Sequence, residues 1–368
     1  MIYSIIMKKI SSCTFLTICL LGASMQVFAG NKDRSGQSGA AELQINPWAS
    51  STGLFAINVA NVSGIEAMKN NIAGLAFVEK TELGISSGVY LTGSNVSIAD
   101  AAVAQKLGNT GVIGLNVMTM GFGDITMTNY NNPEGYGTYH PQFLNIQLGF
   151  AKEFSNSIHA GIAATFISEQ VTNVTATGAC FDAGVQYVTG KRDNFHFGIT
   201  LRNIGTNMRF SGDGFAINVD NQPQATPSYP VTLQYPSDKF ELPTNLNIGA
   251  AYDFFLDENH LKSKDDAPKH RLTAIVDFQS NSFNNDYLGL GAEYAFREMI
   301  MFRAAYRYEN GIGNESTSTT MFTGLACGLT AQKKLGESGP TMAVDYSYRP
   351  TMRPANGVHM ISLRFIRK

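Results

Sequence analysis

The feature that most constrains this chain is an alternation of apolar and polar residues that begins near residue 81 and continues almost to its end. Successive side chains of a β-strand point to opposite faces of the sheet, so a period of two residues predicts strands rather than helices. Fourteen segments follow the pattern, and each is about nine residues long, the length of a tilted membrane-crossing strand. They are residues 81–90, 101–107, 111–120, 143–153, 157–167, 179–189, 195–203, 245–254, 271–279, 287–296, 299–308, 320–330, 341–349 and 357–366.

The two faces of these segments differ in charge. In 271–279, 287–296, 299–308 and 341–349 the apolar face carries no Lys, Asp or Glu. The opposite face of the same four segments carries the charged residues Arg271, Asp277, Glu293, Arg303, Arg307, Asp345 and Arg349. A soluble barrel would turn its charges outward to water, whereas a charge facing the middle of a bilayer costs about 2–4 kcal/mol. We therefore favour a membrane barrel whose charged face lines the interior.

The connections between the segments support this interpretation. Connections at one end are long, up to the 41 residues of 204–244, and most of those at the other end are short turns such as 108–110 and 154–156. Outer-membrane barrels have long outer loops and short periplasmic turns, and an even strand number places both chain ends in the periplasm. The sequence thus predicts an all-β fold, a 14-stranded antiparallel transmembrane β-barrel that spans residues 81–368.

The first 80 residues differ from the barrel. Lys8 and Lys9, an apolar stretch and Val27-Phe28-Ala29 are typical of a secretory signal peptide, which predicts cleavage after residue 29. Residues 30–80 are then an N-terminal leader and hatch segment that is too short to fold alone. A net charge of −2 gives no basic surface for nucleic acid. These features predict export to the outer membrane of a Gram-negative bacterium, with lipid around the barrel.

Motifs that would indicate catalysis are weak. Gly84 to Gly88 fits the G-x-S-x-G pattern of a hydrolase nucleophile, but that motif needs a strand-turn-helix context and these residues lie inside an alternating segment. The six histidines lack zinc-site spacing, and there is no phosphate-binding loop of the G-x-x-x-x-G-K-[ST] type. We therefore predict that the protein is not an enzyme and has no cofactor and no metal.

Charges on the inner face are a first candidate functional set. On neighbouring antiparallel segments, opposite charges are expected to pair, as Asp182 with Arg202, Glu293 with Arg303, and Asp345 with Arg364. One interpretation is a polar path through the barrel. The other is a lattice of ion pairs that braces the barrel wall, since charges turned inward must be paired or hydrated.

The loop 204–244 is the second candidate. It is long for a segment without predicted secondary structure, and such loops are commonly functional or disordered. Its aromatic residues, which are Phe210, Phe215, Tyr229, Tyr235 and Phe240, are typical of surfaces that recognise a protein or peptide. The alternative is that the loop folds back and plugs its own barrel.

Several short stretches together resemble the PorV/PorQ family of the type IX secretion system. Residues 71–76 read Asn-Ile-Ala-Gly-Leu-Ala, where that family usually has Asn-Pro-Ala-Gly-Leu-Ala, and Gly123-Asp124-Ile125 favours the PorV-like branch. The other matching stretches are residues 45–49, 64–67, 183–187, 201–205, 242–244, 291–294, 303–307 and 344–346. The family is similar in fold to FadL, a fourteen-stranded barrel with an N-terminal hatch, which implies that residues 43–76 lie in or under the lumen.

The resemblance also implies a function and partners. PorV-like members bind the C-terminal signal domains of secreted cargo proteins and associate with the translocon, and PorQ-like members serve the attachment complex. We therefore expect a non-enzymatic cargo-binding or shuttle protein, with 204–244 and 121–142 as contact loops. The alternative is a FadL-type channel for hydrophobic small molecules, which would need an apolar pocket that leads from the loops.

Overall fold

The computed structural model describes residue 30 and residues 32–220, 230–257, 268–314, 318–336, 339–352 and 355–368. The predicted signal peptide, residues 1–29, lies outside the described residues. Short helical elements precede the barrel, and within the described residues no helix is both long and apolar enough to cross a membrane. The helical elements before the barrel are η1 (Lys32–Arg34), η2 (Ala41–Gln44), α2 (Ala49–Thr52), η3 (Gly64–Lys69) and η4 (Ile72–Phe77).

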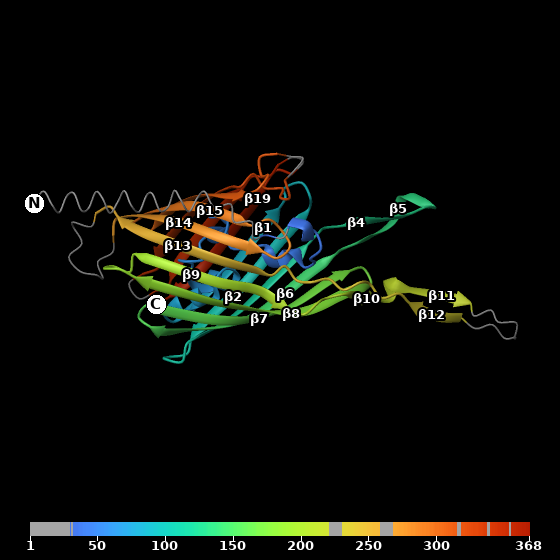
Figure 1. Ribbon diagram of the computed structural model, residues 1–368, viewed down its shortest axis with the longest axis horizontal. Helices are drawn as coiled ribbons and strands as arrows, with labels where there is room; N and C mark the ends of the chain where they lie inside the picture. The colour runs from blue at the N-terminus through green and yellow to red at the C-terminus, as the bar shows by residue number, and fades with distance from the viewer. Residues whose placement is uncertain are drawn as a thin grey trace, which may run out of the picture.

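Fourteen of the fifteen strands of the main sheet in the described chain close into an antiparallel barrel (Figure 1). The barrel strands are β1 (Thr81–Tyr90), β2 (Val96–Lys106), β3 (Val112–Gly121), β6 (Gln142–Ser155), β7 (Ile158–Val171), β8 (Val174–Thr189), β9 (Phe195–Gly205), β13 (Asn245–Phe255), β14 (His270–Asn281), β15 (Tyr287–Phe296), β16 (Ile300–Glu309), β17 (Leu325–Lys334), β18 (Thr341–Arg349) and β19 (Val358–Arg367). Strand β1 pairs with β19, and the ring is complete because each strand pairs with two neighbours. The predicted fourteen-stranded antiparallel barrel is confirmed.

Two strand boundaries differ from the prediction for identifiable reasons. The segment predicted at 320–330 is β17 at Leu325–Lys334, because Gly324 has a φ of +86° and Phe322 turns into the barrel, where it is 8% exposed. The predicted outer loop 168–178 is largely strand, because β7 and β8 continue to pair as far as Val171 and Val174. Their connection is therefore a two-residue turn.

The outer surface of the barrel is apolar along the predicted faces. Leu290 and Phe302 are 57% and 55% exposed, although both are large apolar side chains. Residues of the other face are buried, among them Glu293 and Arg303 of the same strands and Asp345 of β18. Water would disfavour so much apolar surface, whereas the hydrocarbon of a bilayer suits it. The alternation therefore sorts the side chains into a lipid-compatible outer face and a charged inner face.

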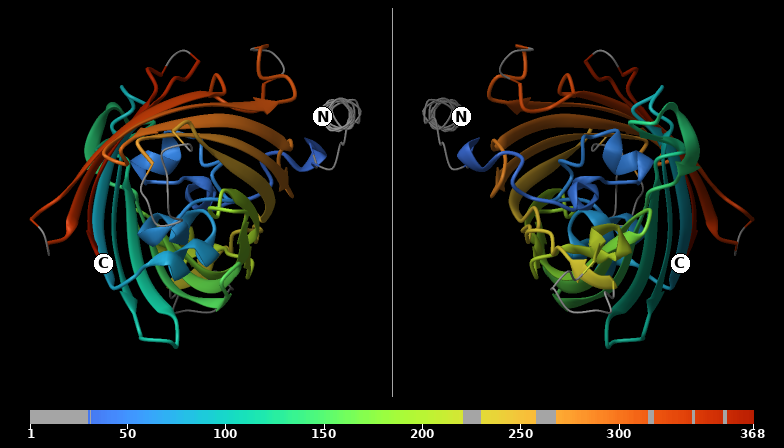
Figure 2. Two further views of the ribbon diagram at one scale, coloured as in Figure 1. Left: turned by 90° about the vertical axis from the view of Figure 1, so that its left-hand side faces the viewer. Right: turned by 90° about the vertical axis from the view of Figure 1, so that its right-hand side faces the viewer.

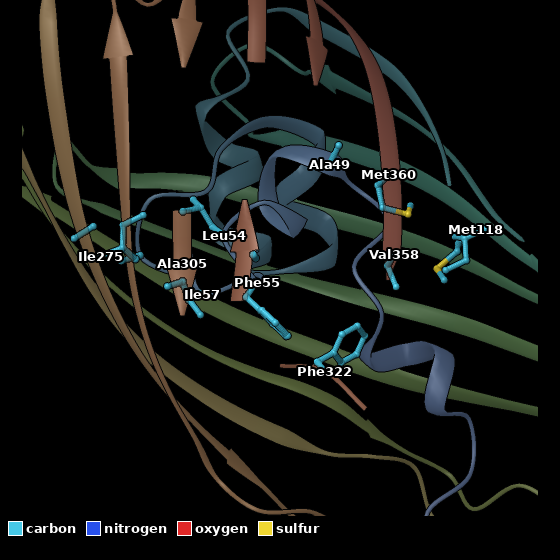
Figure 3. Packing of buried hydrophobic residues seen from close by; sticks show 14 of the residues in the cluster. Ala49, Leu54, Phe55, Ile57, Met118, Ile275, Ala305, Phe322, Val358 and Met360 are labelled. Atoms are coloured by element: carbon cyan, nitrogen blue, oxygen red, sulfur yellow. The ribbon is translucent and has the colours of Figure 1, made fainter. Parts of the chain in front are cut away.

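The lumen is filled by the hatch, which we define as residues 41–77 (Figure 2). Trp48 and Ile65 of the hatch are fully buried, and so are Met68, Ile72 and Leu75. Leu54, Phe55 and Ile57 belong to one buried cluster with residues of the wall such as Met118 and Met360, and Phe55 contacts Phe322 with 5.5 Å between the ring centroids (Figure 3). The hatch has little regular structure of its own, so its packing against the barrel holds it in shape.

Glycines on the inner wall let the hatch come close. A side chain at Gly184 would place its Cβ 2.0 Å from Oδ1 of Asn71, and one at Gly198 would place it 2.6 Å from the carbonyl oxygen of Val59. Both distances are too short for non-bonded atoms. The lumen has room for the hatch only where residues of the wall lack a side chain. The high glycine content of the chain follows in part from this requirement.

An ion-pair network joins the hatch to the wall. Arg364 of β19 lies 2.8 Å from Oε1 of Glu66 in the hatch and 2.9 Å from Oδ2 of Asp345 in β18. The other oxygen of Glu66 accepts hydrogen bonds from the hydroxyls of Ser50 and Ser51. A buried charge needs such partners because removal of one member leaves the others desolvated and unpaired. The network therefore fixes the position of the hatch in the barrel.

The two ends of the barrel differ, as predicted. At one end, which we call the loop end, the β3–β6 connection contains β4 (Ile125–Asn129) and β5 (Asn132–Tyr139), and the β9–β13 connection contains β10 (Phe210–Gly212), η5 (Asp213–Phe215), β11 (Ala216–Asp220) and β12 (Pro230–Gln234). The hairpins β4–β5 and β11–β12 project away from the barrel (Figure 1). The other end has short turns such as residues 156–157 and 297–299.

The assignment of the outer face can be tested at Leu290. We expect Leu290→Arg to lower the free energy of unfolding by about 2–4 kcal/mol, because the charge would face the middle of the bilayer. The matched change Leu290→Phe keeps the face apolar and is expected to have little effect. Urea unfolding of both variants refolded into lipid vesicles measures the difference. Equal stability of the two variants would show that the face is assigned wrongly.

Candidate ligand-binding chamber

A cavity of about 440 Å³ lies inside the barrel between the hatch and the loop end, and we call it the chamber. Its wall includes Tyr90 at the end of β1, Tyr287 at the start of β15 and Arg349 at the end of β18, which are the loop-end positions of these strands. Its floor includes Phe55 and Ala56 of the hatch. The six aromatic residues that line the chamber are Phe55, Tyr90, Phe122, Phe143, Tyr287 and Phe322.

Two arginines of the wall, Arg307 of β16 and Arg349 of β18, lie against these rings, and we call them the arginine pair. Cζ of Arg307 is 4.0 Å from the ring centroids of both Phe55 and Tyr287. Cζ of Arg349 is 5.1 Å from the centroid of Phe55 and 4.7 Å from that of Phe322. Contacts of this kind attract a cation to the face of a ring. Phe55 therefore contacts both guanidinium groups.

Neither member of the arginine pair has a carboxylate partner. No ion pair or side-chain hydrogen bond joins Arg307 or Arg349 to another described residue, and Nε of Arg349 is buried without an acceptor. The opposite residues on the neighbouring strands are Gly289 for Arg307 and Val358 for Arg349, neither of which bears a charge. Guanidinium donors without acceptors in a buried site are unfavourable unless water or a ligand supplies them.

The backbone that holds Phe55 is strained. Phe55 and Ala56 have φ values of +56° and +60°, in the left-handed region that residues with a side chain rarely adopt. Backbone hydrogen bonds hold the turn, from Phe55 N to Thr52 O at 2.9 Å and from Ala56 N to Ser51 O at 2.7 Å. Strained backbone of this kind is concentrated at functional sites. Here it places an aromatic ring between the two arginines.

Other polar groups add to the positive character of the chamber. Arg202 also lines it, and its Nε has no hydrogen-bond partner among the described residues. Glu42 of the hatch is the acidic residue of the lining, and burial, together with the nearby carboxylate of Glu169, raises the pKa of Glu42 to about 8. Both effects favour the neutral form of Glu42, which reduces the negative charge that it sets against the arginines. Asn245, 2% exposed, has both amide atoms unpartnered.

The predicted charge pairs of the inner face lie elsewhere in the lumen. Nε of Arg303 donates to Glu293 at 2.5 Å, and Nη2 of Arg271 lies 2.9 Å from the other oxygen of Glu293. Asp345 and Arg364 are paired within the network that holds the hatch. In both places the charges are matched within the wall or by the hatch. This pairing favours the interpretation that they brace the barrel wall.

The third predicted pair, Asp182 with Arg202, is not formed. A β-bulge in β9 places Arg202 and Asn203 opposite the single residue Asp182, and Asn203 has a φ of +60°. Asp182 accepts hydrogen bonds from the backbone nitrogen of Asn203 at 2.7 Å and from the Gln147 side chain at 2.9 Å. Arg202 instead donates to the carbonyl oxygen of Leu43 at 3.2 Å. The alternation rule fails here because the bulge shifts the register.

The predicted aromatic residues of loop 204–244 do not form one surface. Phe210 and Phe240 pack together, with 5.8 Å between ring centroids, against a buried cluster that includes Leu43 and Met208. Phe215 is half-buried, Tyr235 is 59% exposed, and Tyr229 lies outside the described residues. The base of the loop also binds the leader, through an ion pair of 2.6 Å between Arg34 and Glu241. The hatch rather than this loop fills the lumen.

The remaining motifs have structural roles. The G-x-S-x-G sequence lies in β1, and Oγ of Ser86 is buried and donates to the carbonyl oxygen of Pro47 in the hatch at 2.6 Å. A buried serine inside a strand is not a nucleophile elbow. Within the described residues no group of histidine, cysteine and carboxylate side chains is placed to hold a metal ion.

The fold has relatives among solved structures. The chain resembles the CymD monoaromatic hydrocarbon channel, with a TM-score of 0.51 and 12% identity over 86% of this chain and 96% of that one. It also resembles the toluene transporter TodX of Pseudomonas putida (TM-score 0.52, 10% identity, 83% and 94% covered) and a FadL homologue of Pseudomonas aeruginosa (0.49, 10%, 87% and 98%). The chain has a FadL-like barrel fold. At these identities the likeness shows the fold alone.

Sequence comparison adds no assignment. No protein-family model matches the chain, and no curated protein matches it either. The resemblance to the PorV/PorQ family therefore stays a prediction. By their descriptions, CymD is a channel and TodX is a transporter.

Sequence reasoning placed Arg307 and Arg349 on the inner face but did not select them. The selection rested on opposite charges at neighbouring positions, and these two arginines have none. The absence of an opposite charge on the neighbouring strands would have identified them, because an arginine on the lumenal face without a cross-strand partner needs another acceptor. The contribution of Phe55 was not predictable from the pattern, since it depends on how the hatch folds in the lumen.

Proposed function

We propose that this protein is an outer-membrane barrel that binds hydrophobic small molecules at its loop end and admits them to the membrane or periplasm. The single observation that carries the proposal is the chamber, a cavity of about 440 Å³ with six aromatic residues in its lining. Ligand sites are typically concave and combine apolar side chains with polar groups that orient the ligand, and the chamber combines its six aromatic residues with polar residues such as Asn245 and Arg349.

The fold supports the same proposal. The hydrocarbon channel and the toluene transporter that resemble this chain are described as carriers of aromatic hydrocarbons. An apolar outer face is consistent with a place in the outer membrane, and the hatch below the chamber would prevent free passage of ions and water. Passage would then require a movement of the hatch or of the wall.

Uptake by cells that carry the barrel tests this function. We expect a Gram-negative host without a barrel of this kind to take up labelled toluene faster when it produces the protein. Met120→Trp should reduce the gain several-fold, because Met120 lines the chamber and a larger side chain there would occupy ligand space. Leu290→Phe, on the outer face, is the control. Uptake no faster than in the host without the barrel would contradict the proposal.

A second candidate is the cargo-binding role in type IX secretion that the PorV/PorQ resemblance implies. One specific observation favours it: the hairpins β4–β5 and β11–β12 project from the loop end and expose Tyr130, Tyr136 and Tyr235. Exposed tyrosines are common in protein-binding surfaces. An exposed hairpin also offers an edge strand to which an extended partner segment can be added.

Affinity purification from native membranes tests the second candidate. We expect the intact protein to recover cargo with C-terminal signal domains and components of the translocon or attachment complex. Replacement of residues 216–234 by a short Gly-Ser linker should lose the cargo while the barrel still assembles, because β11 and β12 pair only with each other among the described strands. If neither cargo nor translocon proteins are recovered, this role is excluded.

A further inference from the structure

Three arginines of the lumenal wall have carboxylate partners, and the two arginines of the chamber do not. Arg271, Arg303 and Arg364 each have carboxylate partners within 4 Å. Arg307 and Arg349 have none among the described residues, although both lie on the same inner face and on strands of the same sheet. The arginine pair thus leaves two guanidinium groups without an ion-pair partner at one place in the lumen, although the carboxyl groups of Asp277 and Glu309 are near enough to interact with Arg307 electrostatically. That place adjoins a cavity.

The ring contacts of the arginines are compatible with a planar anion. A guanidinium that lies over a ring uses its face for that contact, and its five N–H donors remain in its own plane. Carboxylates match this arrangement because two oxygens can accept two parallel N–H bonds. Nearby, the unpartnered amide of Asn245 can donate a further hydrogen bond. The floor and walls between these groups are aromatic, which suits a flat apolar body attached to the carboxylate.

We propose that the chamber binds a small aromatic carboxylate whose anionic group is held by Arg307 and Arg349 and whose ring packs against Phe55 and Phe322. The inference deepens the proposed function, because it names a ligand class for the same chamber. The volume of about 440 Å³ limits the ligand to one or two rings with a short substituent. The ring contacts would hold the arginines in place before the ligand binds, which reduces the entropy lost on binding.

Binding to the purified full-length protein in a non-ionic detergent tests this site. The probes are 2-naphthoate and biphenyl-4-carboxylate, each compared with its neutral amide, and fluorescence titration gives the dissociation constants. We expect each carboxylate to bind at least tenfold more tightly than its amide. This comparison needs no variant, so it stands even if substitutions in the wall impair assembly.

Variants then locate the site. Arg307→Gln and Arg349→Gln should each weaken carboxylate binding about tenfold and change amide binding little, whereas Arg34→Gln should leave both unchanged. Arg34 is a matched control, because it lies at the loop end in an ion pair with Glu241 and outside the chamber lining. The inference is overturned if neither carboxylate binds better than its amide, or if Arg34→Gln weakens binding as much as the chamber variants do.

The result of the carboxylate-binding experiment can be distinguished from that of the toluene-uptake experiment. Tight carboxylate binding without toluene uptake would reject passage of neutral hydrocarbons and leave the anion site in place. Toluene uptake with no preference for carboxylates would reject the anion site and leave the proposed function in place.

Discussion

The structure depends on one electrostatic constraint: the outer face of the barrel cannot carry charge. Water is absent from the hydrocarbon core of a bilayer, so each charged side chain of a strand has to turn inward. Inside, the same side chains are desolvated by the hatch and need partners. Glu293 with Arg303 and Asp345 with Arg364 meet this need within the wall, and Glu66 meets it from the hatch. The hatch is therefore part of the charge balance of the barrel as well as its plug.

The chamber is a place where this balance is incomplete. Arg307 and Arg349 contact aromatic rings in place of carboxylates, and the ring they share belongs to a strained turn of the hatch. Replacement of either arginine by a neutral residue would remove an unpaired buried charge, so the arginines are unfavourable for stability alone. Their presence together with the strain at Phe55 is readily explained if a ligand supplies the missing negative charge.

The sequence predicted the architecture well because a membrane barrel follows a simple rule. Alternation with a charge-free face located all fourteen strands and both faces, and the length of the loops distinguished the two ends. The rule failed where the backbone departs from a regular strand, at the bulge of Arg202 and Asn203 and at the turn before Leu325. The alternation rule could not predict the chamber. The fold of residues 41–77 has no periodicity of its own and depends on contacts with strands that are distant in sequence.

The central claim is that the hatch occupies the lumen and leaves a chamber at the loop end. Ion conductance of the purified full-length protein in a planar lipid bilayer tests it most directly. A fourteen-stranded barrel filled by residues 41–77 should show no steady conductance, because ions have no continuous path through it. A stable, open-pore conductance of the unmodified protein would contradict the account.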